Sequence, residues 1–364
     1  MSAISTPAVS VILPVYNAAA YLEESLDSLL KKQTLQNIEV IAVDDCSKDD
    51  SPAILQKRSA EDPRLKVILM KENRGTFSVR KRAVAEAGGK YILFLDPDDF
   101  FDPQTAEELY ALAEKENADI IHFGIKEFVI QPDGSRKALY NWRSCGNEVI
   151  EGEREVLRDL LIRKGHFWAL CFKLIRRELC TLAAEKTKDF YCVMAEDLYF
   201  YVPIAVHARK MLKIENQYYN YNTGSGITSR KILSAEQFKR TATALDALCG
   251  IRDYLQEEKI LDDPEFQSAY LSLEREEILQ LWHKWRSCMV DGTRGDVLPY
   301  LLEHAPDRER LMLAVFDEND YLHNNEEFLK FVKVMYRILN KAFPQNSKLR
   351  LGLKSFAKRI FRKK

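Results

Sequence analysis

Residues 91–99 read Tyr-Ile-Leu-Phe-Leu-Asp-Pro-Asp-Asp, an apolar run followed by three carboxylates within four positions. The run has the length and composition of a buried strand, and Asp96, Asp98 and Asp99 follow its carboxyl end. Open α/β sheets bind their ligands at that edge. Clustered carboxylates repel one another, and a divalent cation relieves the repulsion, so the pattern predicts a Mn²⁺ or Mg²⁺ site. The alternative is an Asp-rich turn that caps the helix beginning near Pro103.

Strand patterns alternate with helical patterns over the first 125 residues. In one helical segment Leu22, Leu26, Leu29 and Leu30 recur at helical spacing. Repeated β-α-β units predict an α/β fold, with a mostly parallel, Rossmann-like sheet flanked by helices. The expected elements are strands 9–13, 38–43, 66–69, 91–95 and 119–124, and helices 21–32, 51–60, 76–87 and 103–117.

The later chain divides into two parts. Residues 126–230 are less regular, whereas the pattern from about residue 234 onward is helical with few Gly or Pro. We therefore expect one unit over residues 1–230, with halves of about 7–125 and 126–230. A helical C-terminal region, 231–364, should follow it.

The charge of the chain is distributed unevenly. The overall net charge is −1, but residues 328–364 hold twelve Lys or Arg and no Asp or Glu, so residues 1–327 carry −13. An acidic body does not favour nucleic acid as a partner. Seven cysteines without CxxC spacing indicate reduced thiols. With no signal-peptide pattern and no span-length apolar run, we expect a cytoplasmic protein that can associate peripherally with the inner face of the plasma membrane.

The basic tail could form an amphipathic helix. Leu349, Leu353, Phe356 and Ile360 would share one side, and Lys and Arg surround them. Such a helix binds anionic membrane surfaces. The alternative is a helix packed on the body of the protein with a solvated basic end.

Other polar segments follow the first and second strands. Pro14-Val15-Tyr16-Asn17 ends the first strand and exposes an aromatic ring that could stack on a flat ligand. Asp44 and Asp45 end the second strand, where carboxylates could accept hydrogen bonds from a base or ribose. Local helix caps are the alternative in both places.

A basic segment precedes the Asp cluster. In residues 73–82 a glycine allows close backbone approach, and an arginine near a helix start can meet phosphate. A solvated basic helix face is the alternative. The chain lacks a GxxxxGK[ST] loop and a GxGxxG after its first strand, so ATPase and NAD-dehydrogenase functions have little support.

Taken together, these segments resemble the ordered motifs of family 2 glycosyltransferases, which have the GT-A fold and use nucleotide-sugar donors. Two later segments also fit: 167–177 resembles the family's Trp-containing acceptor-side strand, and 195–200 resembles the Glu-Asp motif that opens a helix. Residues 219–228 resemble the loop that closes the catalytic unit. The resemblance covers about residues 7–230. It departs at Lys81, where the family often has Asn.

The resemblance implies roles for individual residues. Asp197 would be the catalytic base with Glu196 as its neighbour, and Asp98 with Asp96 would hold the metal. Trp168 and Lys173 would lie on the acceptor side. The residues expected to bind the donor nucleotide are Pro14, Tyr16, Asn17, Asp44, Asp45, Asn73, Gly75, Arg80 and Asp96.

The function implied is inverting transfer of a sugar from a nucleotide diphosphate donor, a UDP-sugar, to a hydroxyl of a glycan or lipid-linked acceptor. Bacterial cell-surface polysaccharide synthesis is the expected setting. Two alternatives stay open at this stage. A nucleotidyltransferase would share a sheet-edge metal but would release pyrophosphate, and a non-catalytic protein would bind the sugar nucleotide or a membrane without turnover.

Overall fold

The computed structural model describes residues 6–143, 146–224 and 234–289, together with residues 297, 300, 301, 303 and 304. The predicted tail helix around residues 348–364 lies outside these residues, as do residues 225–228 of the predicted loop at 219–228. Among the described helices, none combines the length and the apolar composition that crossing a bilayer requires.

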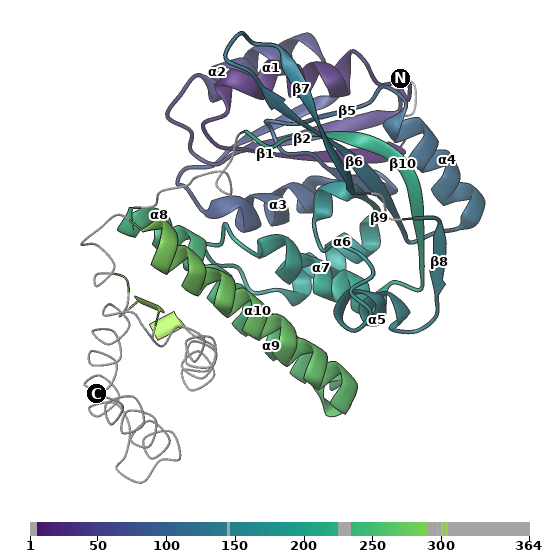
Figure 1. The fold of residues 1–364 in the computed structure, drawn as a ribbon. Helices are drawn as coiled ribbons and strands as arrows, with labels where there is room; N and C mark the ends of the chain where they lie inside the picture. The colour runs from purple at the N-terminus through teal and green to yellow at the C-terminus, as the bar shows by residue number, and fades with distance from the viewer. Residues whose placement is uncertain are drawn as a thin grey trace.

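A ten-stranded sheet forms the centre of the molecule (Figure 1). Its main path runs in the order β3-β2-β1-β4-β9-β6-β10-β5, with β7 paired to β6 and β8 to β10. In chain order the strands are β1 Val9–Val15, β2 Ile38–Asp44, β3 Leu65–Leu69, β4 Tyr91–Phe94, β5 Phe100–Phe101, β6 Ile120–Ile130, β7 Arg136–Arg143, β8 Glu148–Glu151, β9 Lys173–Arg176 and β10 Lys210–Asn222.

Helices cover both faces of this sheet, as predicted for an α/β fold. In Figure 1, α1 and α2 lie on one face and α3, α6 and α7 on the other, while α8, α9 and α10 extend beyond α7. The helices are α1 Ala19–Leu30, α2 Ser51–Glu61, α3 Gly75–Glu86, α4 Thr105–Glu116, α5 Glu155–Leu161, α6 Arg177–Lys186, α7 Glu196–His207, α8 Ala235–Ala242, α9 Ala244–Glu257 and α10 Pro264–Cys288.

The first half of the sheet matches the expected repeat closely. β1 pairs in parallel with β2 and β4, and β2 pairs in parallel with β3. Every residue of β1, β2 and β4 is buried, as strands covered on both faces require. The observed ends of these elements lie within two residues of the expected ones.

The second half of the sheet is mixed. β9 is antiparallel to both β4 and β6, whereas β6 and β10 are parallel. β10 continues through Tyr219–Asn222, where a loop was expected, because Phe100 and Phe101 of β5 pair with Asn220 and Tyr219. This pairing places the end of β10 beside the Asp cluster that follows β4.

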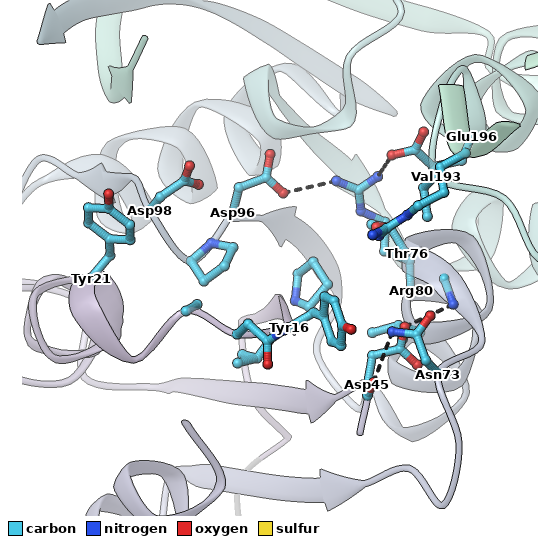
Figure 2. A pocket seen from close by; sticks show the side chains of 18 of the residues that line it. Tyr16, Tyr21, Asp45, Asn73, Thr76, Arg80, Asp96, Asp98, Val193 and Glu196 are labelled. Atoms are coloured by element: carbon cyan, nitrogen blue, oxygen red, sulfur yellow. Dashed lines mark hydrogen bonds and ion pairs between the residues drawn. The ribbon is translucent and has the colours of Figure 1, made fainter. Parts of the chain in front are cut away.

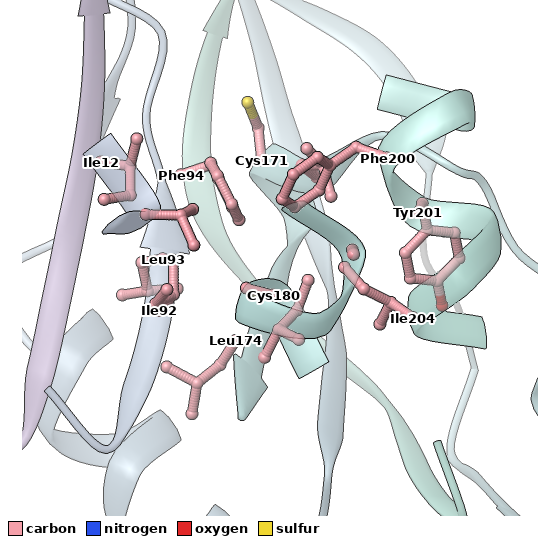
Figure 3. Packing of buried hydrophobic residues seen from close by; sticks show 14 of the residues in the cluster. Ile12, Ile92, Leu93, Phe94, Cys171, Leu174, Cys180, Phe200, Tyr201 and Ile204 are labelled. Carbon is pink, nitrogen blue, oxygen red and sulfur yellow. The ribbon is translucent and has the colours of Figure 1, made fainter. Parts of the chain in front are cut away.

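Apolar side chains fill the space between β4, β9 and the helices beneath them. Figure 3 shows Ile92 and Phe94 of β4 on the side that faces Phe200 and Ile204 of α7. The same cluster includes buried residues of α9 and α10, such as Ile251. The predicted division at residue 230 remains a prediction, and this core continues past it. The six cysteines among the described residues are free thiols.

Candidate active site

A cavity of about 570 Å³ opens at the carboxyl ends of β1, β2 and β4 (Figure 2). Its volume lies within the usual range for small-molecule sites. Loops after three strands and residues from α1, α3, α7 and α8 contribute to its wall. The lining residues are Pro14, Val15, Tyr16, Asn17, Ala18, Tyr21, Asp45, Asn73, Gly75, Thr76, Val79, Arg80, Asp96, Pro97, Asp98, Val193, Glu196, Tyr221 and Arg240.

Asp45 fixes one end of this cavity. Its two carboxylate oxygens accept hydrogen bonds from the backbone N–H groups of Arg74 at 2.7 Å and Gly75 at 2.8 Å. Burial raises the pKa of the Asp45 carboxyl, although these two donors oppose the shift. The Asn73 side chain donates to the Asp45 backbone carbonyl at 3.1 Å. Asp45 therefore joins the end of β2 to the start of α3.

Asn17 joins the first loop to the second. It adopts a left-handed conformation with φ of 50°, and its side-chain oxygen accepts a hydrogen bond from Lys48 N at 2.7 Å. Its own N–H donates to the Ser47 hydroxyl at 2.9 Å. The neighbouring Tyr16 side chain is 39% exposed. The loop therefore holds an aromatic ring open to a ligand.

The three carboxylates after β4 have separate surroundings. Asp99 is buried and accepts hydrogen bonds from the Tyr219 hydroxyl at 2.6 Å and from Asn222 N at 2.7 Å. Burial raises the pKa of Asp99, and the neighbouring carboxylates of Asp98 and Asp96 add to the shift. Asp96 and Asp98 instead line the cavity, and Asp98 forms no hydrogen bond or ion pair with another described residue. Asp99 thus anchors the loop that presents the other two.

Arg80 lies at the centre of the acidic wall. Its guanidinium pairs with Asp96 at 3.0 Å and Glu196 at 3.1 Å, and it also contacts Asp197 (Figure 2 shows the first two contacts). Only 4% of the Arg80 side chain is exposed. Burial disfavours its charge, but Asp197 and Asp96 outweigh that effect and raise the pKa of Arg80. A single cation on helix α3 therefore holds together one carboxylate from the loop after β4 and two from the start of α7.

The Glu196–Asp197 pair opens α7, as the sequence predicts. Glu196 faces the cavity, whereas Asp197 does not line it and accepts a hydrogen bond from Leu170 N at 3.1 Å. Burial raises the pKa of both carboxyls, with the Asp197 charge adding to the shift at Glu196. The attraction of Arg80 opposes both shifts. The pair is therefore suited to hold a proton more readily than exposed carboxylates.

Lys173, which is predicted on the acceptor side, does not line the cavity. It is fully buried, and its ammonium donates to the backbone carbonyls of Phe167 at 2.5 Å and Ala169 at 2.7 Å. It also lies 4.5 Å from the centre of the Tyr201 ring. The Lys173 side chain is therefore buried in the core and stabilises the 167–172 loop through these two hydrogen bonds.

Two further predicted site residues lie outside the cavity wall. Trp168 is half-buried and packs against the main apolar cluster. Asp44 is buried, and its carboxylate accepts a hydrogen bond from Ser47 N at 3.0 Å within its own loop. Adjacent side chains of an extended segment point to opposite sides. The Asp44 side chain therefore points away from the cavity that the Asp45 side chain lines. Of the fourteen predicted site residues, the cavity wall brings together ten: Pro14, Tyr16, Asn17, Asp45, Asn73, Gly75, Arg80, Asp96, Asp98 and Glu196.

The structure adds lining residues that the sequence reasoning missed. Thr76 and Val79 lie within the basic motif already singled out, and Thr76 precedes Arg80 by four residues, so its helical spacing with Arg80 was an available signal. Tyr21 and Val193 gave no such signal. Arg240 comes from α8, more than 140 residues beyond the Asp cluster, and reaches the cavity by tertiary packing.

Gly75 lies where the two halves meet. It has φ of 80°, and a Cβ atom built there would lie 2.9 Å from the Cys192 carbonyl oxygen. Phe77 N donates to the same oxygen at 3.2 Å. The start of α3 therefore packs directly against the segment that leads into α7.

Residues 10–180 match the model of Glycosyl transferase family 2. The chain is 35% identical over 179 residues to the glycosyltransferase GlyG of Streptococcus pneumoniae, an alignment covering 47% of this chain and 57% of GlyG. It is 29% identical over 250 residues to a cholesterol galactosyltransferase of Borreliella burgdorferi, covering 66% and 67% of the two chains. It is 32% identical over 148 residues to the minor teichoic acid biosynthesis protein GgaB of Bacillus subtilis, covering 40% and 16%.

Among solved structures, S. aureus TarS 1–349 in complex with UDP-GlcNAc has a TM-score of 0.52 and 21% identity. The match covers 83% of this chain and 89% of that one. The likeness shows the same GT-A fold. The chain aligns with only part of several relatives, including 57% of GlyG and 16% of GgaB. Residues 10–180 of this chain belong to glycosyl transferase family 2.

Proposed function

We propose that the protein transfers a sugar from a UDP-sugar to a hydroxyl group of a cell-surface glycan or its lipid-linked precursor. The observation that carries the proposal is one cavity that joins an aromatic and amide-lined end to an acidic end. Tyr16, Asp45 and Asn73 lie at the first end, and Asp96, Asp98 and Glu196 at the second. A nucleotide at the first end would place its diphosphate and sugar toward the carboxylates.

The donor and acceptor classes draw support from the relatives. UDP-GlcNAc is bound to TarS, and teichoic acid biosynthesis is in the name of GgaB. The name of the Borreliella relative gives a lipid, cholesterol, as the acceptor of galactose.

The reaction breaks the bond between the anomeric carbon and the leaving phosphate oxygen. It forms a bond from that carbon to the acceptor oxygen, whose proton passes to a carboxylate. We propose that the Glu196–Asp197 pair supplies this carboxylate, with Glu196 at the cavity wall and Asp197 held by Arg80 and Leu170 N. Direct displacement by the acceptor inverts the anomeric carbon.

Asp98 and Asp96 are the residues that would hold a divalent metal. The fit is reasonable because Asp98 has no partner among the described residues, and carboxylate oxygens suit Mn²⁺ and Mg²⁺. The described residues contain no group of three or more metal-ligating side chains, so donor oxygens and water would supply the remaining ligands. Such a metal neutralises the charge of the leaving diphosphate.

The test is turnover of candidate UDP-sugars by the full chain with Mn²⁺. We expect release of UDP, and NMR of the product should show an anomeric configuration opposite to that of the donor. Asp98→Asn should abolish metal-dependent donor binding measured by calorimetry. Release of pyrophosphate would instead identify a nucleotidyltransferase, and neither product nor UDP binding would contradict the proposal.

We also propose that the C-terminal tail docks on an anionic membrane, where a lipid-linked acceptor would be found. The support is the sequence pattern of residues 348–364 alone. The full chain should co-sediment with vesicles containing anionic lipid. A chain ending at Pro344 that co-sediments equally well would contradict this role for the tail.

A further inference from the structure

Helix α8 places the cationic side chain of Arg240 in the wall of the cavity. This helix lies beyond residues 10–180, which match the family 2 model. The helix begins with a capping box, in which Gln237 N donates to the Ser234 hydroxyl at 3.2 Å and Ser234 N donates to the Gln237 side chain at 2.9 Å. Phe238 and Ala242 on one side of α8 are buried in a second apolar cluster. Arg240 lies between them in sequence and lines the cavity.

The Arg240 side chain has aromatic neighbours but no ion pair within the described part of the chain. Its guanidinium carbon lies 6.0 Å from the centre of the Tyr16 ring, and the side chain hydrogen-bonds the Tyr191 hydroxyl. Its Nε atom is buried without a hydrogen-bond partner among the described residues. A buried donor without a partner is unfavourable, so a bound acceptor would stabilise it.

The charges around the cavity make Arg240 the natural partner of an anion. Four carboxylates line the wall, at Asp45, Asp96, Asp98 and Glu196. Arg80 already pairs with two of them and with Asp197, so its charge is balanced within the protein. Arg240 forms no ion pair with a described residue, although its charge also attracts the neighbouring Asp45 carboxylate. A diphosphate entering this acidic cavity needs such a cation, and a guanidinium can bind phosphate through two hydrogen bonds.

We propose that Arg240 binds the diphosphate of the donor, so that the C-terminal helical region completes the donor site. The inference rests on the proposed function and deepens it by assigning α8 a role in donor recognition. The second apolar cluster, with Leu245 of α9 and Ile278 of α10, would hold α8 in place for this contact.

The experiment measures binding of UDP and uridine to the full chain by calorimetry in buffer with Mn²⁺. For Arg240→Gln we expect at least a tenfold loss of UDP affinity with uridine affinity unchanged, because only UDP carries the diphosphate. Arg240→Lys should fall between the wild type and Arg240→Gln, since it keeps the charge but loses the planar fork. Lys239→Ala, the exposed neighbour on α8, is the matched control and should bind UDP normally.

The outcomes separate this inference from the proposed function. If the wild type binds no UDP, the proposed function fails. If the wild type binds UDP and Arg240→Gln binds it equally well, the role of Arg240 is wrong. An equal loss of UDP and uridine affinity would also overturn the inference, because Arg240 would then contact the nucleoside. Arg240→Lys still gives a readout if Arg240→Gln does not fold.

Discussion

The two halves of the site are held together in different ways. Around Asp45 and Asn17 the contacts are short hydrogen bonds to backbone N–H groups within neighbouring loops. Around Glu196 and Asp197 the supports are buried cations, because Arg80 and Lys173 arrive from other elements. Backbone hydrogen bonds fix a loop locally, whereas a buried charge makes distant elements depend on one another.

This difference predicts where substitutions should be most costly. Breaking a buried ion pair leaves uncompensated charge in a poorly solvated place, which costs more than losing one neutral hydrogen bond. The half of the site around Glu196 and Asp197 should therefore be more sensitive to substitution than the half around Asp45 and Asn17, both in stability and in activity.

The largest effect is expected for Arg80→Met. The substitution leaves three carboxylates from β4 and α7 without their shared cation, so the free energy of unfolding should fall by about 3–5 kcal/mol. Urea unfolding followed by circular dichroism measures this change. Arg82→Met is the matched control, because Arg82 lies on the same helix, pairs only with Glu86 among the described residues and is 45% exposed. Equal effects of the two variants would contradict the central role of Arg80.

Asp197→Asn should reduce transfer at least about a hundredfold, the lower range for loss of a general base. UDP binding should persist, because Asp197 lies outside the cavity wall. Steady-state kinetics and calorimetry measure the two quantities. Glu196→Gln, made in parallel, shows which carboxylate takes the proton. Near-normal turnover in either variant removes that residue from the role of base.

Lys173→Met should lower the free energy of unfolding by about 1–3 kcal/mol, because the carbonyls of Phe167 and Ala169 would lose their donor. Transfer should fall further than stability alone explains, since the adjoining Leu170 N holds Asp197. Lys115→Met, at a side chain that is 78% exposed, serves as control. If Lys173→Met and the control were equally stable and active, the loop would not depend on Lys173.

A smaller effect on stability is expected in the half of the site around Asp45 and Asn17. Asp45→Asn keeps one acceptor oxygen for the two N–H groups of Arg74 and Gly75, so unfolding should become easier by about 1 kcal/mol. Chemical denaturation provides the measurement, with the exposed Asp50→Asn as control. A loss as large as that of Arg80→Met would contradict the comparison between the two halves.

The smallest effect is a displacement of the pH profile. The carboxylate that accepts the proton must be ionised, so kcat/KM falls as pH falls through its pKa. Burial raises the pKa of Glu196, so the acid limb should lie above 4.5, the ordinary value for Glu. The limb would report the Glu196–Asp197 pair as a unit. Measuring UDP binding over the same pH range separates the effect of pH on donor binding from its effect on transfer. An acid limb at or below pH 4.5 would contradict the expectation.

Local patterns in the sequence were enough to predict the strands β1, β2 and β4 whose ends meet at the cavity. β1, β2 and β4 are short apolar runs that end in polar residues, so the spacing alone located the strand ends that meet at the cavity. Periodicity also located α1, whose buried leucines Leu22, Leu26, Leu29 and Leu30 follow helical spacing.

The rest depended on tertiary packing that no local pattern encodes. The direction of Lys173 into the core follows from β9 pairing with both β4 and β6. Asp44 and Asp45 are chemically identical in the sequence, and only the strand direction decides which one reaches the cavity. Arg240 is one basic residue among many on C-terminal helices, and its position depends on how α8 packs. The tail near Phe356 lies outside the described residues, so its prediction stays a prediction.

Gly75 restricts which residues can occupy the contact between the start of α3 and the segment that leads into α7. With no room for a methyl group beside Cys192, this residue allows the start of α3 to lie directly against the segment that leads into α7. A larger side chain at position 75 would displace the backbone at Cys192, because its first carbon atom would already lie too close to the carbonyl oxygen. The contact between these two segments thus depends on a residue that carries no functional group of its own.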